Sequence, residues 1–144
     1  FSEVWLPQKK SEVFSFFADE KNLEKLTPPY LNFHVLKKST EAIQEGTLID
    51  YRLKIHGVAI QWRSLIESWE PCNRFIDRQV KGPYKLWHHT HEFEEFAGGT
   101  LMRDRVLYKL HLGRLGLLVT GAFVKSDVTK IFSYRKKIIT QIFH

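Results

Sequence analysis

Polar and apolar residues alternate along the chain from position 33 to position 108. The clearest run is 47–56, in which Ile49, Tyr51, Leu53 and Ile55 fall on one face and polar residues on the other. Successive side chains of a strand point to opposite faces, so this pattern predicts a half-buried antiparallel strand. The same pattern predicts a strand at 2–6 and a meander of six strands at 33–39, 47–56, 59–70, 74–80 and in the two halves of 82–108.

Helical spacing marks both ends of the chain. Residues 11–18 have the apolar density of a short helix with Ser11 as a candidate N-cap, and Asp19 could cap a second short helix that Pro28 and Pro29 end. From about residue 122 the pattern predicts a long amphipathic helix. Arg135 lies inside its apolar stripe, and a buried guanidinium needs a partner. The stripe consists of Val124, Val128, Ile131, Arg135, Ile138 and Ile142, widened by Phe132, Ile139 and Phe143.

The hairpin predicted at 82–108 mixes ionisable and apolar residues on one face. A Gly-Gly pair separates its two alternating runs and indicates the turn. Two imidazoles stand among aromatic residues in the first run, and one carboxylate stands in an apolar row in the second. These polar groups either pair inside the protein or meet a ligand. The two faces are Trp87, His89, His91 and Phe93, and Met102, Asp104, Val106, Tyr108 and Leu110.

Composition restricts the broad class. The 144 residues are 43% hydrophobic and 26% charged, which is typical of one globular domain, taken here as residues 1–144. Aromatic residues reach 14%, which fits either a thick core or a ring-lined cavity. The formal net charge is +6, but no basic run exceeds residues 135–137 and no nucleic-acid signature occurs, so we expect no nucleic-acid partner.

Compartment and membrane signals are sparse. Cys72 is the only cysteine, which excludes an internal disulfide and fits a reducing compartment. No apolar run is long enough to span a membrane and no signal peptide is visible, so the sequence favours a cytoplasmic location. The apolar, glycine-punctuated segment 112–123 is either an ordinary packed connection, a lid, or an edge that touches a membrane transiently.

The order of elements predicts an α+β fold in which a curved antiparallel sheet of about seven strands wraps on the long C-terminal helix, with two short helices after the first strand. The chain resembles the START-like superfamily, also called SRPBCC, which has the helix-grip fold of birch pollen allergen. The resemblance covers essentially the whole chain and is closest to the bacterial polyketide cyclase/dehydrase-like and ligand-binding SRPBCC proteins. It rests on the element order, on Trp-Glu-Pro-Cys-Asn-Arg-Phe (69–75), on Gly-Pro-Tyr-Lys-Leu-Trp-His-His-Thr-His-Glu-Phe (82–93) and on Gly-Gly-Thr-Leu-Met-Arg-Asp-Arg-Val-Leu-Tyr (98–108).

The resemblance also implies which residues face the long helix. Similar chains place apolar residues there, whereas this chain places several ionisable or amide side chains among them. Its inward face is therefore expected to be unusually polar. The implied inward residues are Glu67, Trp69, Phe75, Asp77, Gln79, Trp87, His89, His91 and Phe93.

Two interpretations of these inward polar residues remain open. With Asp104 and Arg135 they form either a satisfied structural network, since buried charges are retained when paired, or the floor of a cavity that orients the polar group of an apolar ligand. The candidate ligand-binding residues are Tyr51, Leu53, Glu67, Trp69, Phe75, Asp77, Gln79, Trp87, His89, His91, Phe93, Asp104, Tyr108, Val128, Phe132 and Arg135.

The same residues also allow two further hypotheses, a catalytic site and a metal site. His89 or His91 with Asp77 or Glu67 could supply a general acid and base, because burial can tune either pKa toward neutrality. His89 and His91 lie two apart on one strand face, and Glu67 or Asp77 could complete a metal site. That spacing is common by chance and the resemblance implies no metal, so we expect neither a metal nor a cofactor.

The sequence therefore predicts a domain that binds a small hydrophobic or lipid-like ligand in a cavity between sheet and helix. The alternatives are a cyclase/dehydratase-type enzyme that uses His/carboxylate acid-base chemistry, and an interaction module with a filled interior. The superfamily hosts carriers, cyclases, hydrolases and ribosome-associated factors on one scaffold, so the fold alone does not choose between them. No residue pattern names a protein partner.

Overall fold

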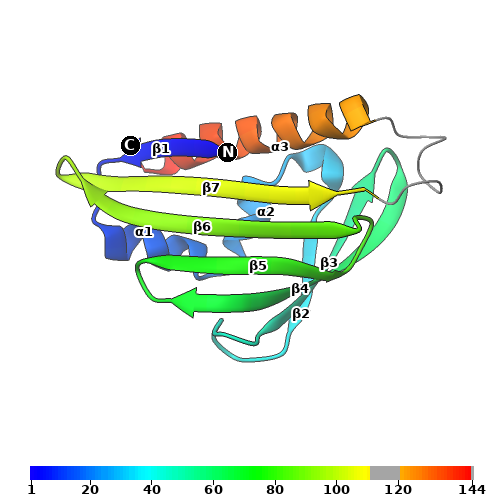
Figure 1. The fold of residues 1–144 in the computed structure, drawn as a ribbon, viewed down its shortest axis with the longest axis horizontal. Helices are drawn as coiled ribbons and strands as arrows, with labels where there is room; N and C mark the ends of the chain where they lie inside the picture. The colour runs from blue at the N-terminus through cyan, green and yellow to red at the C-terminus, as the bar shows by residue number, and fades with distance from the viewer. Residues whose placement is uncertain (111–120, 144) are drawn as a thin grey trace.

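A seven-stranded antiparallel sheet packed against helices forms the molecule (Figure 1). The computed structural model describes residues 1–110 and 121–143. Strand order across the sheet is β1-β7-β6-β5-β4-β3-β2, so six consecutive strands form a meander and the first strand closes beside the last. The predicted α+β helix-grip fold is confirmed. The elements are β1 (Ser2–Leu6), α1 (Lys10–Phe17), α2 (Asn22–Leu26), η1 (Pro29–Leu31), β2 (His34–Lys38), β3 (Leu48–Ile55), β4 (Val58–Glu70), β5 (Arg74–Lys81), β6 (Leu86–Phe96), β7 (Gly99–Lys109) and α3 (Gly121–Ile142).

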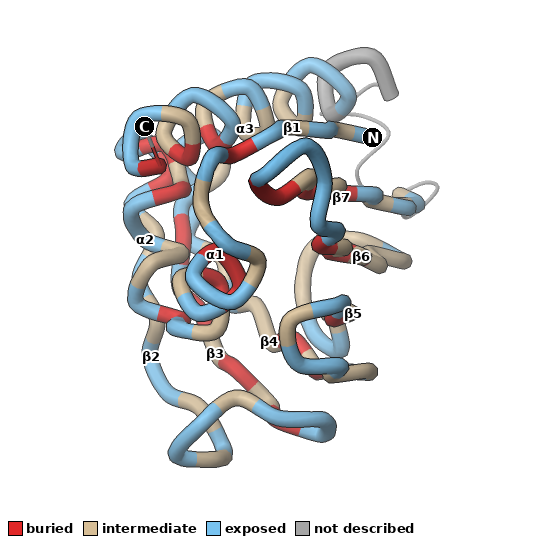
Figure 2. The backbone as a smooth tube through the Cα atoms, turned by 90° about the vertical axis from the view of Figure 1, so that its left-hand side faces the viewer, coloured by how far each residue is buried: buried red, intermediate tan, exposed pale blue. Residues whose placement is uncertain are grey.

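The sheet bends around α1 and α2, and α3 lies along β1 and α2 (Figure 2). Two buried clusters fill the concave side. One joins α1, β6, β7 and the end of α3, and the other joins β3 and β4. Their members are Leu6, Val13, Phe14, Phe17, Leu26, Phe75, Phe93, Met102, Ile139 and Phe143 in the first, and Ile49, Tyr51 and Ile66 in the second.

The short helices begin at other residues than predicted. Lys9, not Ser11, holds the N-cap position of α1, and its side chain makes no capping hydrogen bond. Asp19 accepts a hydrogen bond from the backbone N–H of Lys21, in the turn before α2 rather than at its cap. Side-chain pattern locates a helix to within a turn, whereas the cap depends on how the preceding backbone enters it.

The turn of the β6–β7 hairpin lies one residue earlier than the Gly-Gly pair suggested. Phe96 pairs with Gly99, and Ala97 and Gly98 occupy the turn with φ angles of 49° and 77°. A two-residue turn with positive φ at both positions matches the twist of the flanking strands. Gly99 is needed for another reason, since a Cβ there would collide with the carbonyl of Leu6 on β1.

The buried line of α3 differs from the predicted stripe in one position. Arg135, Ile139 and Phe143 are buried at steps of four, while Ile142 is 42% exposed. Adjacent helical residues are about 100° apart, so a line through Phe143 turns Ile142 outward. No described helix combines the length and hydropathy needed to cross a membrane. Val124 and the segment 112–123 fall outside the residues whose side chains are described.

Candidate functional site

A cavity of about 570 Å³ lies between the concave face of the sheet and the helices. Strands β3, β4, β5 and β6 form one wall, and α1, α2, η1 and α3 form the other. Aromatic and aliphatic side chains dominate its lining. Four ionisable residues, Asp77, His89, His91 and Arg135, gather where β5 and β6 approach α3, and His56, Asp127 and Lys130 also line the cavity. Of the predicted ligand-binding residues, nine line it: Tyr51, Leu53, Trp69, Phe75, Asp77, Trp87, His89, His91 and Arg135.

The ionisable group in its wall is the inner cluster, defined as Asp77, His89, His91, Asp104 and Arg135. Cross-strand register brings its members together. Asp77 on β5 is opposite His89 on β6, and His91 on β6 is opposite Asp104 on β7. Alternation along each strand then points all four side chains to the concave face, where Arg135 approaches from α3.

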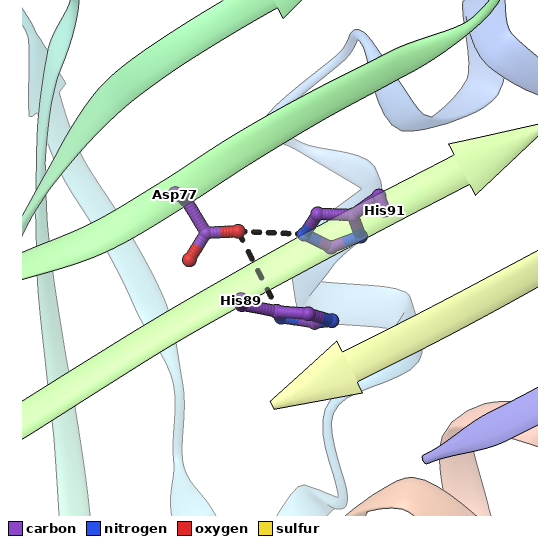
Figure 3. A group of neighbouring side chains, drawn as sticks. All are labelled: Asp77, His89 and His91. Carbon is purple, nitrogen blue, oxygen red and sulfur yellow. Dashed lines mark hydrogen bonds and ion pairs between the residues drawn. The ribbon is translucent and has the colours of Figure 1, made fainter. Parts of the chain in front are cut away.

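Two carboxylates sandwich the two imidazoles of the inner cluster. His89 Nε2 is 2.9 Å and His91 Nδ1 is 3.1 Å from the same oxygen, Oδ1 of Asp104. On the cavity side, His91 Nε2 is 2.6 Å from Oδ2 of Asp77, and His89 Nδ1 is 3.7 Å from that atom (Figure 3). Carboxylates accept only, so His89 donates from Nε2 and His91 donates from both nitrogens.

Arg135 closes the cluster on the side of Asp104. Its Nε lies 3.8 Å from Oδ2 of Asp104 and Nη2 lies 3.5 Å from Nδ1 of His91, while the guanidinium carbon lies 5.3 Å from the ring centroid of Phe17. Within the described residues Nε has no hydrogen-bond partner. The predicted burial of Arg135 is confirmed, with Asp104 as its carboxylate neighbour.

Both carboxyl groups stay ionised. Burial alone would raise the pKa of Asp104, but the charge of Arg135 and the hydrogen bonds from the two imidazoles outweigh it and hold that pKa well below its usual value. Burial opposes ionisation of Asp77 as well, yet the nearby imidazoles His89 and His91 lower its pKa. Asp77 and Asp104 therefore contribute two negative charges to the cluster.

The two imidazoles differ in protonation although they are neighbours. Burial, with the nearby charge of His91, lowers the pKa of His89 to about 4, so this ring is neutral near pH 7. Burial also opposes charge on His91, but hydrogen bonds to Asp104 and Asp77 prevail and raise its pKa. His89 therefore keeps a bare Nδ1 near Asp77 and the cavity, whereas His91 holds a proton on each nitrogen.

Aromatic contacts fix how the two rings lie. Phe75 stacks on His91 with ring centroids 4.0 Å apart and planes 14° apart. The His89 and His91 rings are 3.6 Å apart, and Phe132 meets the His89 ring edge-on at 5.4 Å. Ring rotation would break both the stacking and the hydrogen bonds, so the orientations are held from several sides.

Four predicted residues lie at a second, smaller cavity on the other side of the inner cluster. Its volume is about 330 Å³, and it is bounded by β1, β7 and α3. Asp104 thus faces this smaller cavity, while Asp77 lines the larger one. The predicted residues found there are Asp104, Tyr108, Val128 and Phe132.

Glu67 was predicted to face inward, and this prediction is wrong. β4 contains a bulge opposite β5, where Ile66 pairs with Asp77 and Ser68 with Ile76, so Glu67 is the extra residue. A bulge shifts the alternation by one, which turns Glu67 outward while Trp69 stays inside. Glu67 instead pairs with Arg78 at 3.3 Å and His88 at 3.0 Å. We call Glu67, Arg78 and His88 the outer cluster.

Gln79 and Phe93 face inward but do not line the larger cavity. The side-chain amide of Gln79 donates to the carbonyl of Tyr84 and accepts from its N–H, which clamps the β5–β6 turn. Phe93 is buried among core rings, 5.3 Å from Phe14 and 5.7 Å from Phe17. Both hold the scaffold around the cavity.

The sequence-based prediction missed a part of the lining that comes from loops, from the first half of β4 and from α3. Trp62 and Ser64 precede the bulge, where the predicted faces of β4 were reversed relative to the cavity. Tyr84 lies in a turn, and burial raises its pKa to about 12. Alternation along β4 could have revealed Trp62 and Ser64 only if the bulge were known. The lining residues outside the prediction include Phe33, Ile43, Trp62, Ser64, Tyr84, Asp127, Lys130 and Ile131.

Comparison with known proteins bears on the fold alone. No family profile and no curated protein matches the sequence. Solved structures do match. Protein Ms6760 from Mycobacterium smegmatis is 16% identical with a TM-score of 0.68, covering 97% of this chain and 87% of that one. Ara h 8.0201 is 13% identical with a TM-score of 0.68, covering 99% and 94%.

A third structure, the di-domain ARO/CYC StfQ from the steffimycin biosynthetic pathway, is 9% identical with a TM-score of 0.77, covering 99% of this chain and 49% of that one. A START superfamily protein from Mycobacterium smegmatis is 12% identical with a TM-score of 0.70 and covers 99% and 94%. At these identities the likeness concerns architecture. The chain therefore has the helix-grip fold of START-like proteins, as its sequence resemblance implied.

Proposed function

We propose that residues 1–144 act as one domain that binds a small, largely apolar molecule in the 570 Å³ cavity, with an oxygen-bearing group of that molecule against the inner cluster. The observation that carries this proposal is the contrast within the cavity wall. Rings and aliphatic side chains line most of it, and four ionisable residues of the inner cluster, Asp77, His89, His91 and Arg135, converge at one place. Ligand sites in proteins have this composition, and their volumes are roughly 300–1,000 Å³.

The polar end of the cavity has a donor and an acceptor for such a group. The side chain of Asp77 is 21% exposed, against 7% for Asp104, so Asp77 is the carboxylate that a ligand hydroxyl reaches. Arg135 also lines the cavity, and its Nε lacks a partner within the described residues. A ligand carbonyl or carboxylate would supply the missing acceptor and offset the cost of leaving that N–H unpaired.

Filling the cavity tests the proposal. Leu53 and Lys54 are adjacent on β3, and the first lines the cavity while the second is exposed on the other face. Leu53→Trp is expected to abolish binding of a fluorescent apolar probe such as 1-aminoanthracene and to remove co-purified ligand in native mass spectrometry. Lys54→Trp is the matched control and should bind like the wild type. Equal probe binding by the two variants, or none by the wild type, would contradict the proposal.

The bare Nδ1 of His89 supports a second candidate, acid-base chemistry of the cyclase/dehydratase type. Asp104 holds the ring from behind through Nε2, which leaves Nδ1 free to take a proton from a molecule in the cavity. His89→Gln should then leave ligand binding intact and change the mass of the bound molecule, because the substrate accumulates unconverted. Identical bound masses in wild type and variant would leave simple binding as the function. An interaction module with a filled interior is disfavoured by the cavity itself.

A further inference from the structure

Three side chains of the inner cluster direct ligand atoms toward one point in the cavity wall (Figure 3). The candidate ligand atoms of Asp77, His89 and His91 all lie within 4.8 Å of one another. Oδ2 of Asp77 is 2.6 Å from Nε2 of His91 and 3.7 Å from Nδ1 of His89. Two imidazole nitrogens and one carboxylate oxygen form the donor set used for Zn²⁺ and for non-haem Fe²⁺, with further positions left open.

The opposite nitrogen of each imidazole is already engaged in the way that metal-bound histidines require. His89 Nε2 and His91 Nδ1 both face Oδ1 of Asp104, at 2.9 Å and 3.1 Å. A histidine ligand usually donates its second N–H to a carboxylate, which fixes the tautomer and aims the other nitrogen at the metal. Here one carboxylate does this for both rings, while Phe75 stacks on one of them.

Charge and access also favour a cation at this point. Binding of an ion requires His91 to release its Nε2 proton, as metal-binding histidines do. In that state Asp77 and Asp104 outnumber Arg135, so the ion would meet an excess negative charge. Arg135 lies against Asp104, with its Nε 3.8 Å from Oδ2, so Asp104 is the carboxylate that the guanidinium pairs with. Asp77 lines the larger cavity, and its side chain is 21% exposed, so an ion can reach it from the cavity. The partly exposed carboxylate can also change its orientation to coordinate the ion.

We propose that Asp77, His89 and His91 bind one divalent transition-metal ion of the Zn²⁺/Fe²⁺ class, with Asp104 as the carboxylate that orients both imidazoles and with open coordination positions facing the cavity. The ion would replace the proton between Asp77 and His91 by two bonds of roughly 2.0–2.2 Å. This reverses the expectation from sequence that no metal binds. The proposal does not depend on the organic ligand proposed above, since metal binding is measurable in its absence.

Cobalt(II) is a suitable probe, because its visible absorption reports the donor set. The wild-type chain, freed of metal with a chelator and then dialysed, should take up one equivalent of Co²⁺ with saturable d–d bands. Asp77→Asn keeps the side-chain shape and removes the anionic ligand, so the affinity of the variant for Co²⁺ should fall at least ~10-fold. A loss of that size is already typical when a residue that merely hydrogen-bonds to a metal ligand is replaced. His88→Gln is the matched control, on the same strand but in the outer cluster, and should bind Co²⁺ like the wild type.

Proton NMR of the Co²⁺-bound wild type tests the geometry without any variant. Two hyperfine-shifted imidazole N–H signals should appear and vanish in D₂O, one from His89 Nε2–H and one from His91 Nδ1–H. Absence of one-equivalent uptake by the wild type, or unchanged affinity in a folded Asp77→Asn, would overturn the proposal. If circular dichroism shows that Asp77→Asn does not fold, the proton NMR spectrum of the Co²⁺-bound wild type is the test. Fewer than two hyperfine-shifted imidazole N–H signals in that spectrum would then reject the site.

Discussion

The inner and outer clusters place the same kinds of ionisable side chain on opposite faces of the sheet, and they share strands β5 and β6. Each combines histidine, a carboxylate and arginine, and His88 of the outer cluster is flanked in sequence by His89 of the inner one. Side chains of the outer cluster are 40%, 27% and 37% exposed at Glu67, His88 and Arg78. In the inner cluster, His91 and Asp104 are only 3% and 7% exposed.

The inner and outer clusters differ in how deeply their side chains are buried. Exposed ion pairs gain little because water competes for both partners, so the outer cluster adds at most a modest stabilisation. In the inner cluster removal from water works against every charge, and each charge persists only because its neighbours are fixed within hydrogen-bonding distance. In the inner cluster the pKa values of both imidazoles and both carboxylates are shifted from their ordinary values.

Removing the guanidinium should give the largest effect. Arg135→Met leaves Asp104 without its counter-charge in the interior, so the free energy of unfolding should fall by about 3–5 kcal/mol. Urea denaturation followed by tryptophan fluorescence measures it. Arg78→Met in the outer cluster is the matched control and should cost about 0–1 kcal/mol. Equal losses for the two would mean that burial does not distinguish the clusters.

A smaller loss is expected at the cavity-facing carboxylate. Asp77→Asn weakens the hydrogen bond to His91, and such bonds to charged groups contribute about 1.5–3 kcal/mol. Because Asp77 is 21% exposed and water can replace part of the interaction, we expect a loss of about 1–2 kcal/mol in the same denaturation experiment. A loss as large as that of Arg135→Met would show that Asp77 is as dry as Asp104.

The smallest effect should come from the outer carboxylate. Glu67→Gln removes the pairs with Arg78 and His88, at an expected cost of about 0–1 kcal/mol. In 1 M NaCl the Debye length is about 3 Å, so the difference from wild type should shrink toward zero. Melting temperatures at low and high salt measure this. A salt-independent loss above that of Asp77→Asn would place the outer pair in a buried environment.

Much of the fold follows from local patterns that survive packing. Period-two alternation located all seven strands, because a half-buried strand needs one apolar face wherever it sits in the sheet. The histidines, Asp77 and Asp104 were likewise placed on the concave face, since each lies in an uninterrupted run of alternation. Arg135 was recognised as buried from its place among apolar helix positions.

The sequence-based predictions that were wrong depend on contacts between distant segments. The bulge that expels Glu67 exists only in the pairing of β4 with β5, and nothing in the residues near Glu67 marks it. The division of the predicted lining between two cavities depends on where α3 crosses the sheet, which places Val128 and Phe132 beside one and Ile131 and Arg135 beside the other.

The sequence by itself determined which groups could meet, namely two imidazoles, two carboxylates and a guanidinium on faces that turn inward. Tertiary structure alone decided how they meet. Register places both imidazoles on one oxygen of Asp104 and their other nitrogens toward Asp77. Burial then makes the His89 ring neutral, while hydrogen bonds to both carboxylates keep the His91 ring charged. The physical reason is that alternation is a local property of the backbone, whereas hydrogen-bond distance and desolvation depend on atoms that other strands and the helix bring.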